Sequence, residues 1–447
     1  MVAAPNRDRP GRTRAVPARI TVANLSSDVM KPADTVCRSP FCAYRTSIIA
    51  VVTPLRARRR PRLRVGAVAA AVLIGCVPAC TSVTPTLADF TVTDSSVPST
   101  TSIDVPPPPV RKASNVLYKR LAPGEQPPQF ILFSFDGVGV TPNWDEFLTA
   151  ADETDARFTA LMTGLYFLTD KARRHYRGPG HEPGEAALAF GGTRTEVTEQ
   201  IDYLNRTWYA GHEMGTHYVG HFCAGTTHPG KDWTTRDWNH ELDQFFSLMS
   251  NWRRNTGIHT GDDLAFGPDV VKGGRTQCLE GSPKTLFPAL RAHDMTWDSS
   301  MPADQPGITW PSKVNGIWEF PVPYFYSPPL KQRQTALDYN FWYSYNKAKN
   351  APRQAPKIRR IVRDTYRYMY KRAYHGNRAP LVIANHFNTW SGNAFNPATW
   401  DFMREVCTNP DTICATYTDV IAWMEMQDPA VLKQFQRRPA VAVDARR

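Results

Sequence analysis

Short apolar runs alternate with amphipathic segments over residues 127–426, and no second linker interrupts this stretch. Residues 130–135 form an apolar run bounded by proline and glycine, which predicts a buried strand. Strand-like runs also lie at residues 381–385 and 413–417. Strands that alternate with helices favour an α/β architecture with a largely parallel sheet. We therefore expect one large domain with loop insertions.

Three segments carry the signals of helix starts. Thr193 and Glu196 have the spacing of a capping box. Four apolar residues then fall on one helical face: Val197, Ile201, Leu204 and Trp208. Ser282 before proline and Asn396 before proline predict two further helices. The polar and aromatic segment 328–355 shows neither the helical nor the strand periodicity of apolar residues, which predicts an irregular insertion.

The net charge of +12 invites a nucleic-acid interpretation, so its location matters. Residues 1–79 contain 14 Lys and Arg but only 3 Asp and Glu, which is a net charge of +11. The remaining 368 residues therefore carry a net charge of only +1. A phosphate-tracking surface has no support from bulk charge, and we expect no nucleic-acid partner.

The basic block has the pattern of an export signal over residues 56–79. Arginines precede an apolar run of small residues, 65–79, that is too short for a stable membrane anchor. The run ends Val-Pro-Ala-Cys80, which resembles the lipobox of bacterial lipoproteins and implies that Cys80 carries a lipid anchor to the membrane. Plain secretion is the alternative. Residues 1–55 form a basic extension, or an over-long start before Met30 or Val51.

Two further segments flank the folded body. Residues 80–126 begin with a stretch rich in serine, threonine and proline, which predicts an extended linker between the anchor and the domain. The domain itself is expected over residues 127–428. Residues 429–447 are basic and are predicted to be a C-terminal tail.

Four cysteines lie in the exported body, and none has C-x-x-C spacing. An even number in an oxidising compartment favours disulfides over a metal cluster. Cys407 with Cys414 would close the turn between a helix and a strand, which leaves Cys223 with Cys278 by elimination. Free buried thiols are the alternative.

Residues 211–221 read GHEMGTHYVGH and hold three histidines and a carboxylate. His212 and His217 are five residues apart, which excludes the His-Glu-x-x-His helix of metalloproteases. His217 and His221 have the i, i+4 spacing that places both imidazoles on one side of a helical turn, within reach of one divalent ion. A structural or accidental histidine pair is the alternative.

Six short sequence motifs, of which residues 211–221 are one, follow in order along the chain. They are Ser134-Phe135-Asp136, residues 211–221, Gly274-Arg275-Thr276, residues 296–301, residues 377–390 and residues 417–424. Together they resemble the NodB-type polysaccharide deacetylases of carbohydrate esterase family 4, in the branch that includes chitin deacetylases. The resemblance covers about residues 129–426 and implies a distorted (β/α) barrel with a single catalytic domain.

The resemblance also implies roles for individual residues. Asp136 would be the catalytic base, oriented and kept ionised by Arg275. His386 would be the general acid that protonates the departing amine. His217 and His221 would hold a divalent metal, expected to be zinc, which polarises the acetyl carbonyl. The implied activity is removal of N-acetyl groups from a polysaccharide such as peptidoglycan or a chitin-like glycan.

The sequence departs from the family pattern at two positions. Gly137 replaces the usual third metal ligand, an aspartate, and Gln277 stands where proline is usual. Either Asp136 itself moves onto the metal and another group serves as the base, or a carboxylate from elsewhere such as Asp145 fills the gap, or the metal site is lost. A non-catalytic glycan-binding lipoprotein is therefore the alternative function, and an O-acetyl esterase would share the same site chemistry.

Aromatic residues offer a further prediction about the glycan. Five tryptophans could form a platform on which sugars stack: Trp144, Trp297, Trp318, Trp342 and Trp390. Burial in the core is the commoner fate of such residues.

Overall fold

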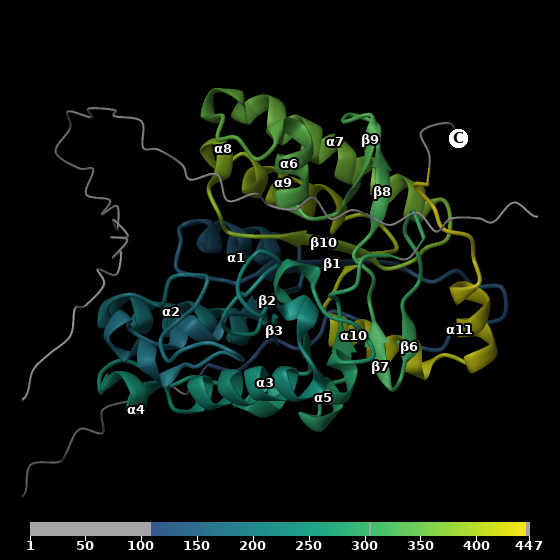
Figure 1. The fold of residues 1–447 in the computed structure, drawn as a ribbon. Coiled ribbons are helices and arrows are strands. Elements are labelled where there is room, and N and C mark those ends of the chain that lie inside the picture. The colour runs from purple at the N-terminus through teal and green to yellow at the C-terminus, as the bar shows by residue number, and fades with distance from the viewer. Residues whose placement is uncertain (1–108, 304, 444–447) are drawn as a thin grey trace, which may run out of the picture. The chain divides into compact units, whose positions relative to one another are not determined.

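The computed structural model describes residues 109–303 and 305–443 (Figure 1). The predicted extension, the signal segment 56–79 and Cys80 lie outside these described residues. Among the described helices, none combines the length and the apolar character needed to cross a membrane.

A nine-stranded sheet of strands in the order β10-β1-β2-β3-β4-β5-β7-β6, with β11 also paired to β1, organises the body. Its strands are β1 Gln129–Asp136, β2 Phe158–Met162, β3 Glu213–Thr216, β4 Gly273–Gly274, β5 Trp297–Asp298, β6 Ser312–Val314, β7 Ile317–Glu319, β10 Leu381–Asn385 and β11 Thr412–Cys414. All pairs are parallel except β6 with β7. The sheet curls into an open half-barrel, which confirms the prediction of an α/β, distorted (β/α) barrel fold.

The helices lie around this sheet. They are α1 Asn143–Glu153, α2 Arg194–Tyr209, α3 Thr235–Ser250, α4 Trp252–Thr256, α5 Leu286–Ala292, α6 Asp338–Asn346, α7 Ala355–Tyr374, α8 Trp390–Asn393, α9 Phe395–Val406, α10 Tyr417–Met426 and α11 Pro429–Gln436. Figure 1 shows α7, α8 and α9 grouped beside β10, and α3 and α5 beyond β3 in the same view. A separate hairpin of β8 Tyr324–Ser327 and β9 Gln332–Thr335 precedes α6.

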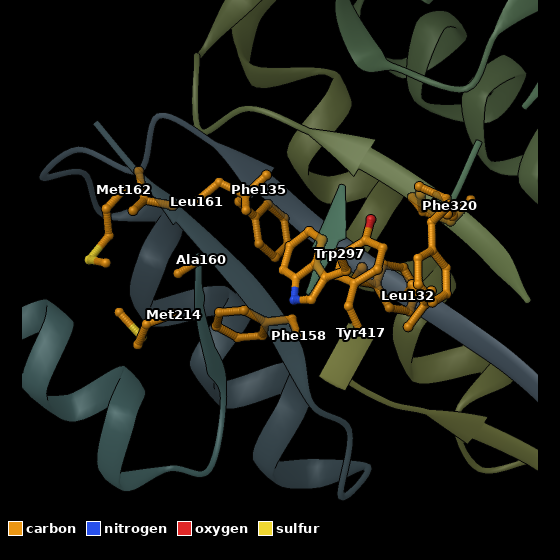
Figure 2. Packing of buried hydrophobic residues seen from close by; sticks show 14 of the residues in the cluster. Leu132, Phe135, Phe158, Ala160, Leu161, Met162, Met214, Trp297, Phe320 and Tyr417 are labelled. Atoms are coloured by element: carbon orange, nitrogen blue, oxygen red, sulfur yellow. The ribbon is translucent and has the colours of Figure 1, made fainter. Parts of the chain in front are cut away.

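The core is packed against the central strands. All eight residues of β1 are buried, as expected for a parallel strand that is covered on both faces. Figure 2 shows Phe135, Phe158 and Trp297 within one apolar cluster. Trp297 stacks on Tyr417 with ring centroids 4.3 Å apart. Each such fully buried large side chain contributes roughly 1.5–3 kcal/mol of transfer free energy.

Several predicted elements are found close to where the sequence places them. Helix α2 begins after Thr193, and both hydrogen bonds of the capping box with Glu196 are present, which confirms that prediction. Helix α5 begins at Leu286, three residues after Pro283, and Thr285 precedes it without a side-chain capping hydrogen bond. β11 ends at Cys414 and α10 starts at Tyr417, so the run 413–417 is shorter as a strand than expected.

The predicted irregular insertion, the predicted linker and the predicted C-terminal tail carry more structure than expected. The insertion 328–355 contains β9 and α6. In the predicted linker, the Lys112 backbone N–H donates to Tyr209 and Val116 is buried. The predicted tail contains α11, whose Phe435 stacks on Trp310 with centroids 5.3 Å apart. These segments pack on the body because each supplies an apolar side chain to it.

Candidate active site

Asp136 is the last residue of β1 and is 3% exposed. Its Oδ1 accepts a hydrogen bond of 2.6 Å from Nη1 of Arg275. Burial alone would raise the pKa of Asp136, but the Arg275 guanidinium and the nearby histidines hold that pKa below its ordinary value. The carboxylate is therefore ionised at neutral pH.

Arg275 follows β4 and is completely buried, with all five N–H groups occupied. The partners are the Ser299 carbonyl and hydroxyl, the Ser134 hydroxyl, Asp136 and the Tyr417 hydroxyl. Burial opposes the cation, yet the Asp136 carboxylate raises the pKa of Arg275. Removal of one partner of such a buried pair costs about 3–5 kcal/mol, so the guanidinium fixes Asp136 in one orientation.

A second buried carboxylate, that of Glu213 at the start of β3, helps to hold the hydrogen-bond network around Arg275 in place. It accepts hydrogen bonds from Thr159 at 2.8 Å, from the Trp297 indole at 3.2 Å and from the Tyr417 backbone N–H at 2.9 Å. Thr418 donates to it through both its backbone and its hydroxyl. Glu213 thereby holds the N-terminus of α10, and with it the tyrosine that contacts Arg275.

His217 directly follows β3. Its Nδ1 donates to the Arg275 carbonyl at 2.8 Å, which leaves Nε2 as the unprotonated nitrogen. That Nε2 is buried and has no hydrogen-bond partner in the structure. Burial lowers the pKa of His217 to about 4, and burial together with His217 lowers the pKa of His221 to about 3. Both imidazoles are neutral, as metal ligands must be.

The ring centroids of His217 and His221 are 5.4 Å apart, but the predicted helical turn between them is wrong. The segment after β3 is an irregular loop in which Tyr218 and His221 have φ of 57° and 56°. These left-handed residues bring two side chains of i, i+4 spacing together without a helix.

Glu241 of α3 holds this loop. Its Oε1 accepts from the backbone N–H groups of Gly220 at 2.7 Å and Val219 at 3.1 Å, and Tyr176 donates to the same carboxylate. Burial raises the pKa of Glu241 to about 7. A Cβ at Gly220 would lie 2.1 Å from the Tyr176 hydroxyl oxygen, so only glycine fits there. No spacing in the sequence links Glu241 to the histidines, and sequence reasoning missed it.

His386 follows β10 and has a dedicated acidic partner. Its Nδ1 donates to Oδ1 of Asp338 at 2.7 Å, and its backbone N–H donates to Oδ2 at 2.8 Å. Burial would lower the pKa of His386, but the Asp338 carboxylate raises it. Asp338 begins α6 and is completely buried. Sequence reasoning missed this residue as well, because it lies in the segment expected to be irregular.

One cavity of about 480 Å³ is lined by Asp136, His217, His221 and His386. Its walls contain Asp136, Gly137, Tyr166, Leu188, His217, His221, Leu337, Tyr339, His386, Asn388 and Trp390, among others. Of the cavity-lining residues that the structure describes, Asp136 alone has a carboxylate. The strands β1, β3 and β10 thus bring the predicted base, metal ligands and acid to one place.

The predicted tryptophan platform is mostly wrong. Trp390 lines the cavity, and Trp342 stacks behind it with ring centroids 4.9 Å apart. Trp144 and Trp297 are completely buried in the core, and the Trp318 indole donates to Glu425.

The structure also bears on the missing third metal ligand. A Cβ at Gly137 would lie 3.6 Å from Cδ2 of His217 and 3.1 Å from the Thr163 hydroxyl, so a side chain there would lie beside the histidine. Asp145 does not supply the ligand, because its carboxylate binds Arg206 and Tyr203 outside the cavity. The unpartnered Nε2 of His217 nevertheless fits a metal, with His221 beside it and Asp136 as the available anion.

Two disulfides are present, Cys223–Cys278 and Cys407–Cys414. The first lies in the cavity wall, next to His221. The second joins the end of α9 to β11.

Comparisons with known proteins give remote similarities only. No family model and no curated protein matches this sequence. A Mycobacterium smegmatis structure assigned as a polysaccharide deacetylase is 16% identical, with a TM-score of 0.40, and the match covers 70% of this chain and 97% of that one.

Two other solved structures are similar at lower identity. One is a family 4 carbohydrate esterase from Streptomyces lividans, at 10% identity, a TM-score of 0.31 and coverage of 71% and 98%. Another is a family 4 pseudoenzyme from Bacillus anthracis, at 8% identity, a TM-score of 0.32 and coverage of 62% and 60%. The activity therefore has to be argued from the chain's own residues.

Proposed function

We propose that this protein is a metal-dependent deacetylase that hydrolyses N-acetyl groups of a cell-wall or extracellular polysaccharide. One observation carries the proposal: Asp136 and His386 share a cavity, and their buried partners shift their pKa values in opposite directions. Arg275 favours the ionised form of Asp136, and Asp338 favours the protonated form of His386. Two titratable groups separated in this way are suited to act as base and acid.

Asp136 acts as the base. It accepts a proton from the water that attacks the acetyl carbonyl, while Arg275 holds the carboxylate in place. His386 acts as the acid and donates its proton to the amine nitrogen as the carbon–nitrogen bond breaks. Its Nδ1 is held by Asp338, so the proton leaves from Nε2.

His217 and His221 would hold the divalent metal, with Asp136 as the third ligand at a stage of the reaction at which it does not act as the base. Two imidazoles and a carboxylate are a known catalytic zinc set, so zinc is the metal that we propose. When bound, the metal supplies polarisation of the acetyl carbonyl and lowers the pKa of water. The structure supports this ligand set through the neutral state of both imidazoles and the unpartnered His217 Nε2.

The metal can be tested separately from turnover. His217→Ala and His221→Ala should each abolish stoichiometric binding of zinc to the purified chain, measured by elemental analysis after dialysis. His212→Ala is the matched control. That imidazole stacks on Phe158 and accepts from its backbone N–H at 3.2 Å, so it serves the core.

Gly137 supports a second candidate function, a glycan-binding protein without catalysis. A site with Asp136 as its only carboxylate has no separate anion for the metal and for proton transfer. In this function the cavity and Trp390 would bind sugar, and the protein would release no acetate. Acetate assays on N-acetylated and O-acetylated glycans distinguish binding, N-deacetylation and O-acetyl esterase activity.

We also propose that the protein is exported and anchored to the membrane by a lipid on Cys80. The support is the arginine-rich segment, the apolar run and the cysteine that follows it. An anchored chain would meet cell-wall glycan, which agrees with the proposed substrate.

A further inference from the structure

The cavity wall beside His221 contains two cysteines that the proposed catalysis does not use, and together with His221 they form a group of potential metal ligands. Nδ1 of His221 lies 3.6 Å from Sγ of Cys223, which is joined to Cys278. One ligand atom from each of these three residues lies within 4.8 Å of the other two. All three residues line the cavity.

The spacing of these atoms suits a tetrahedral zinc ion. With Zn–N of about 2.0–2.1 Å and Zn–S of about 2.3 Å, an imidazole nitrogen and a thiolate on one ion lie about 3.6 Å apart. His221 and Cys223 have this separation already. One histidine and two cysteines, with a fourth position open, is also a known zinc ligand set. The disulfide blocks it, because bonded sulfur atoms are not thiolates.

We propose that reduction of the Cys223–Cys278 disulfide opens a second divalent-metal site, formed by His221 and the two thiolates. A dithiol donates two electrons and two protons, so the S–S bond breaks, two thiols form and the reductant becomes a disulfide. Each cysteine then loses its proton as the metal binds. The ligand is a thiophilic divalent ion such as zinc.

The position of this disulfide makes it the one that a reductant would reach first. Cys278 is exposed and Cys223 is half-buried at the cavity. In the other disulfide, Cys414 is 1% exposed and Cys407 is half-buried. Exposed disulfides are the more labile class. Cys278 has φ of 54° in the short 3₁₀ segment Gln277–Leu279 between β4 and α5, and the two sulfur atoms would have to separate to about 3.8 Å on one zinc ion.

The consequence is a link between redox state and the cavity. His221 belongs to both ligand sets, so a metal held by the thiolates competes for the imidazole that pairs with His217. The second site needs neither Asp136 nor His217. It therefore stands or falls independently of the deacetylase proposal.

The test uses the full chain with His217→Ala, which removes the other histidine pair. The protein is reduced with a phosphine, which binds zinc weakly, and titrated with Co²⁺ while the thiolate-to-cobalt charge-transfer band is recorded in the near ultraviolet. We expect one Co²⁺ per chain with this band, and at least tenfold weaker binding without it in the oxidised chain. Near-ultraviolet circular dichroism before titration shows that the reduced chain keeps its tertiary packing.

Two paired variants complete the design. Cys223→Ser with Cys278→Ser should abolish the band, whereas Cys407→Ser with Cys414→Ser should keep it. Co²⁺ binding without the band in the reduced chain would overturn the proposal, and so would a band that survives Cys223→Ser with Cys278→Ser. Loss of tertiary packing on reduction of the wild-type chain would overturn it too. If the paired serine variant does not fold, His221→Ala in the reduced chain must lower Co²⁺ affinity at least tenfold.

Discussion

Asp338 accepts two hydrogen bonds from His386, one from the imidazole Nδ1 at 2.7 Å and one from the backbone nitrogen at 2.8 Å. This carboxylate raises the pKa of His386, whereas burial lowers the pKa of His217 to about 4. The pKa values of two histidines that line one cavity are thus shifted in opposite directions. One is suited to donate a proton and the other to bind a metal.

Asp338→Asn should therefore move the basic limb of the pH–rate profile to lower pH. Without the carboxylate, the pKa of His386 falls and the acid form is lost earlier as pH rises. The turnover number should also fall, by about 10²-fold. A pH profile of kcat measures both. A basic limb that does not move would mean that His386 is not the acid.

Glu241→Gln should change how stability depends on pH. Burial raises the folded-state pKa of Glu241 from 4.5 to about 7, so the folded chain binds this proton more tightly than the unfolded chain. The resulting stabilisation is present below pH 4.5 and is lost as pH rises through about 7, with a size of up to about 3 kcal/mol. The Gln variant cannot titrate and should show a flatter dependence.

Urea unfolding at about pH 5 and about pH 8 measures this difference. Glu199→Gln, at an exposed position on the neighbouring helix α2, is the matched control and should behave like wild type. The same slope in Glu241→Gln as in wild type would show that this carboxylate is not the source of the pH dependence.

Gly137→Asp should tighten zinc binding by about tenfold or more, which is about 1.4 kcal/mol. The new carboxylate would extend from a position whose Cβ lies 3.6 Å from the His217 ring. Gly137 has φ of 61°, which aspartate and asparagine tolerate better than most residues. Gly137→Asn carries the same backbone strain without the charge, so it is the control. Equal affinity in both variants would contradict the assigned ligand set.

Cys80→Ala should release the protein from the membrane or leave it unprocessed. Wild type should partition into the detergent phase because a lipid chain on Cys80 adds buried apolar surface. Phase partition and the mass of the mature N-terminus measure this. Wild type found only in the soluble secreted fraction would argue for plain secretion.

The fold and the side chains that line the cavity could be predicted from the sequence. The buried carboxylates that hold those side chains in place could not. Asp136, His217 and His386 each come at or directly after the end of a parallel strand, and such ends lie together. Hydrophobic runs locate those strands. Glu241 and Asp338 reach the site from helices, through contacts that span 21 or more residues, and no local pattern marks such contacts.

The loop between His217 and His221 shows a second limit. Its i, i+4 spacing predicts a helical turn, but two left-handed residues and the Glu241 carboxylate produce the same proximity by another path. Tertiary hydrogen bonds, and not local helix propensity, determine the backbone conformation here. The spacing therefore identifies two side chains that lie close together, but the helical turn that it predicts is absent.

The most direct test of the deacetylase proposal is acetate release from N-acetylglucosamine oligomers and peptidoglycan by the purified full chain. We predict that wild type releases acetate only when a divalent metal is supplied, and that Asp136→Asn lowers the rate by at least ~10²-fold while near-ultraviolet circular dichroism shows it folded. If metal-loaded wild type binds these glycans but releases no acetate from any N- or O-acetylated form, the deacetylase proposal is wrong and the glycan-binding function takes its place.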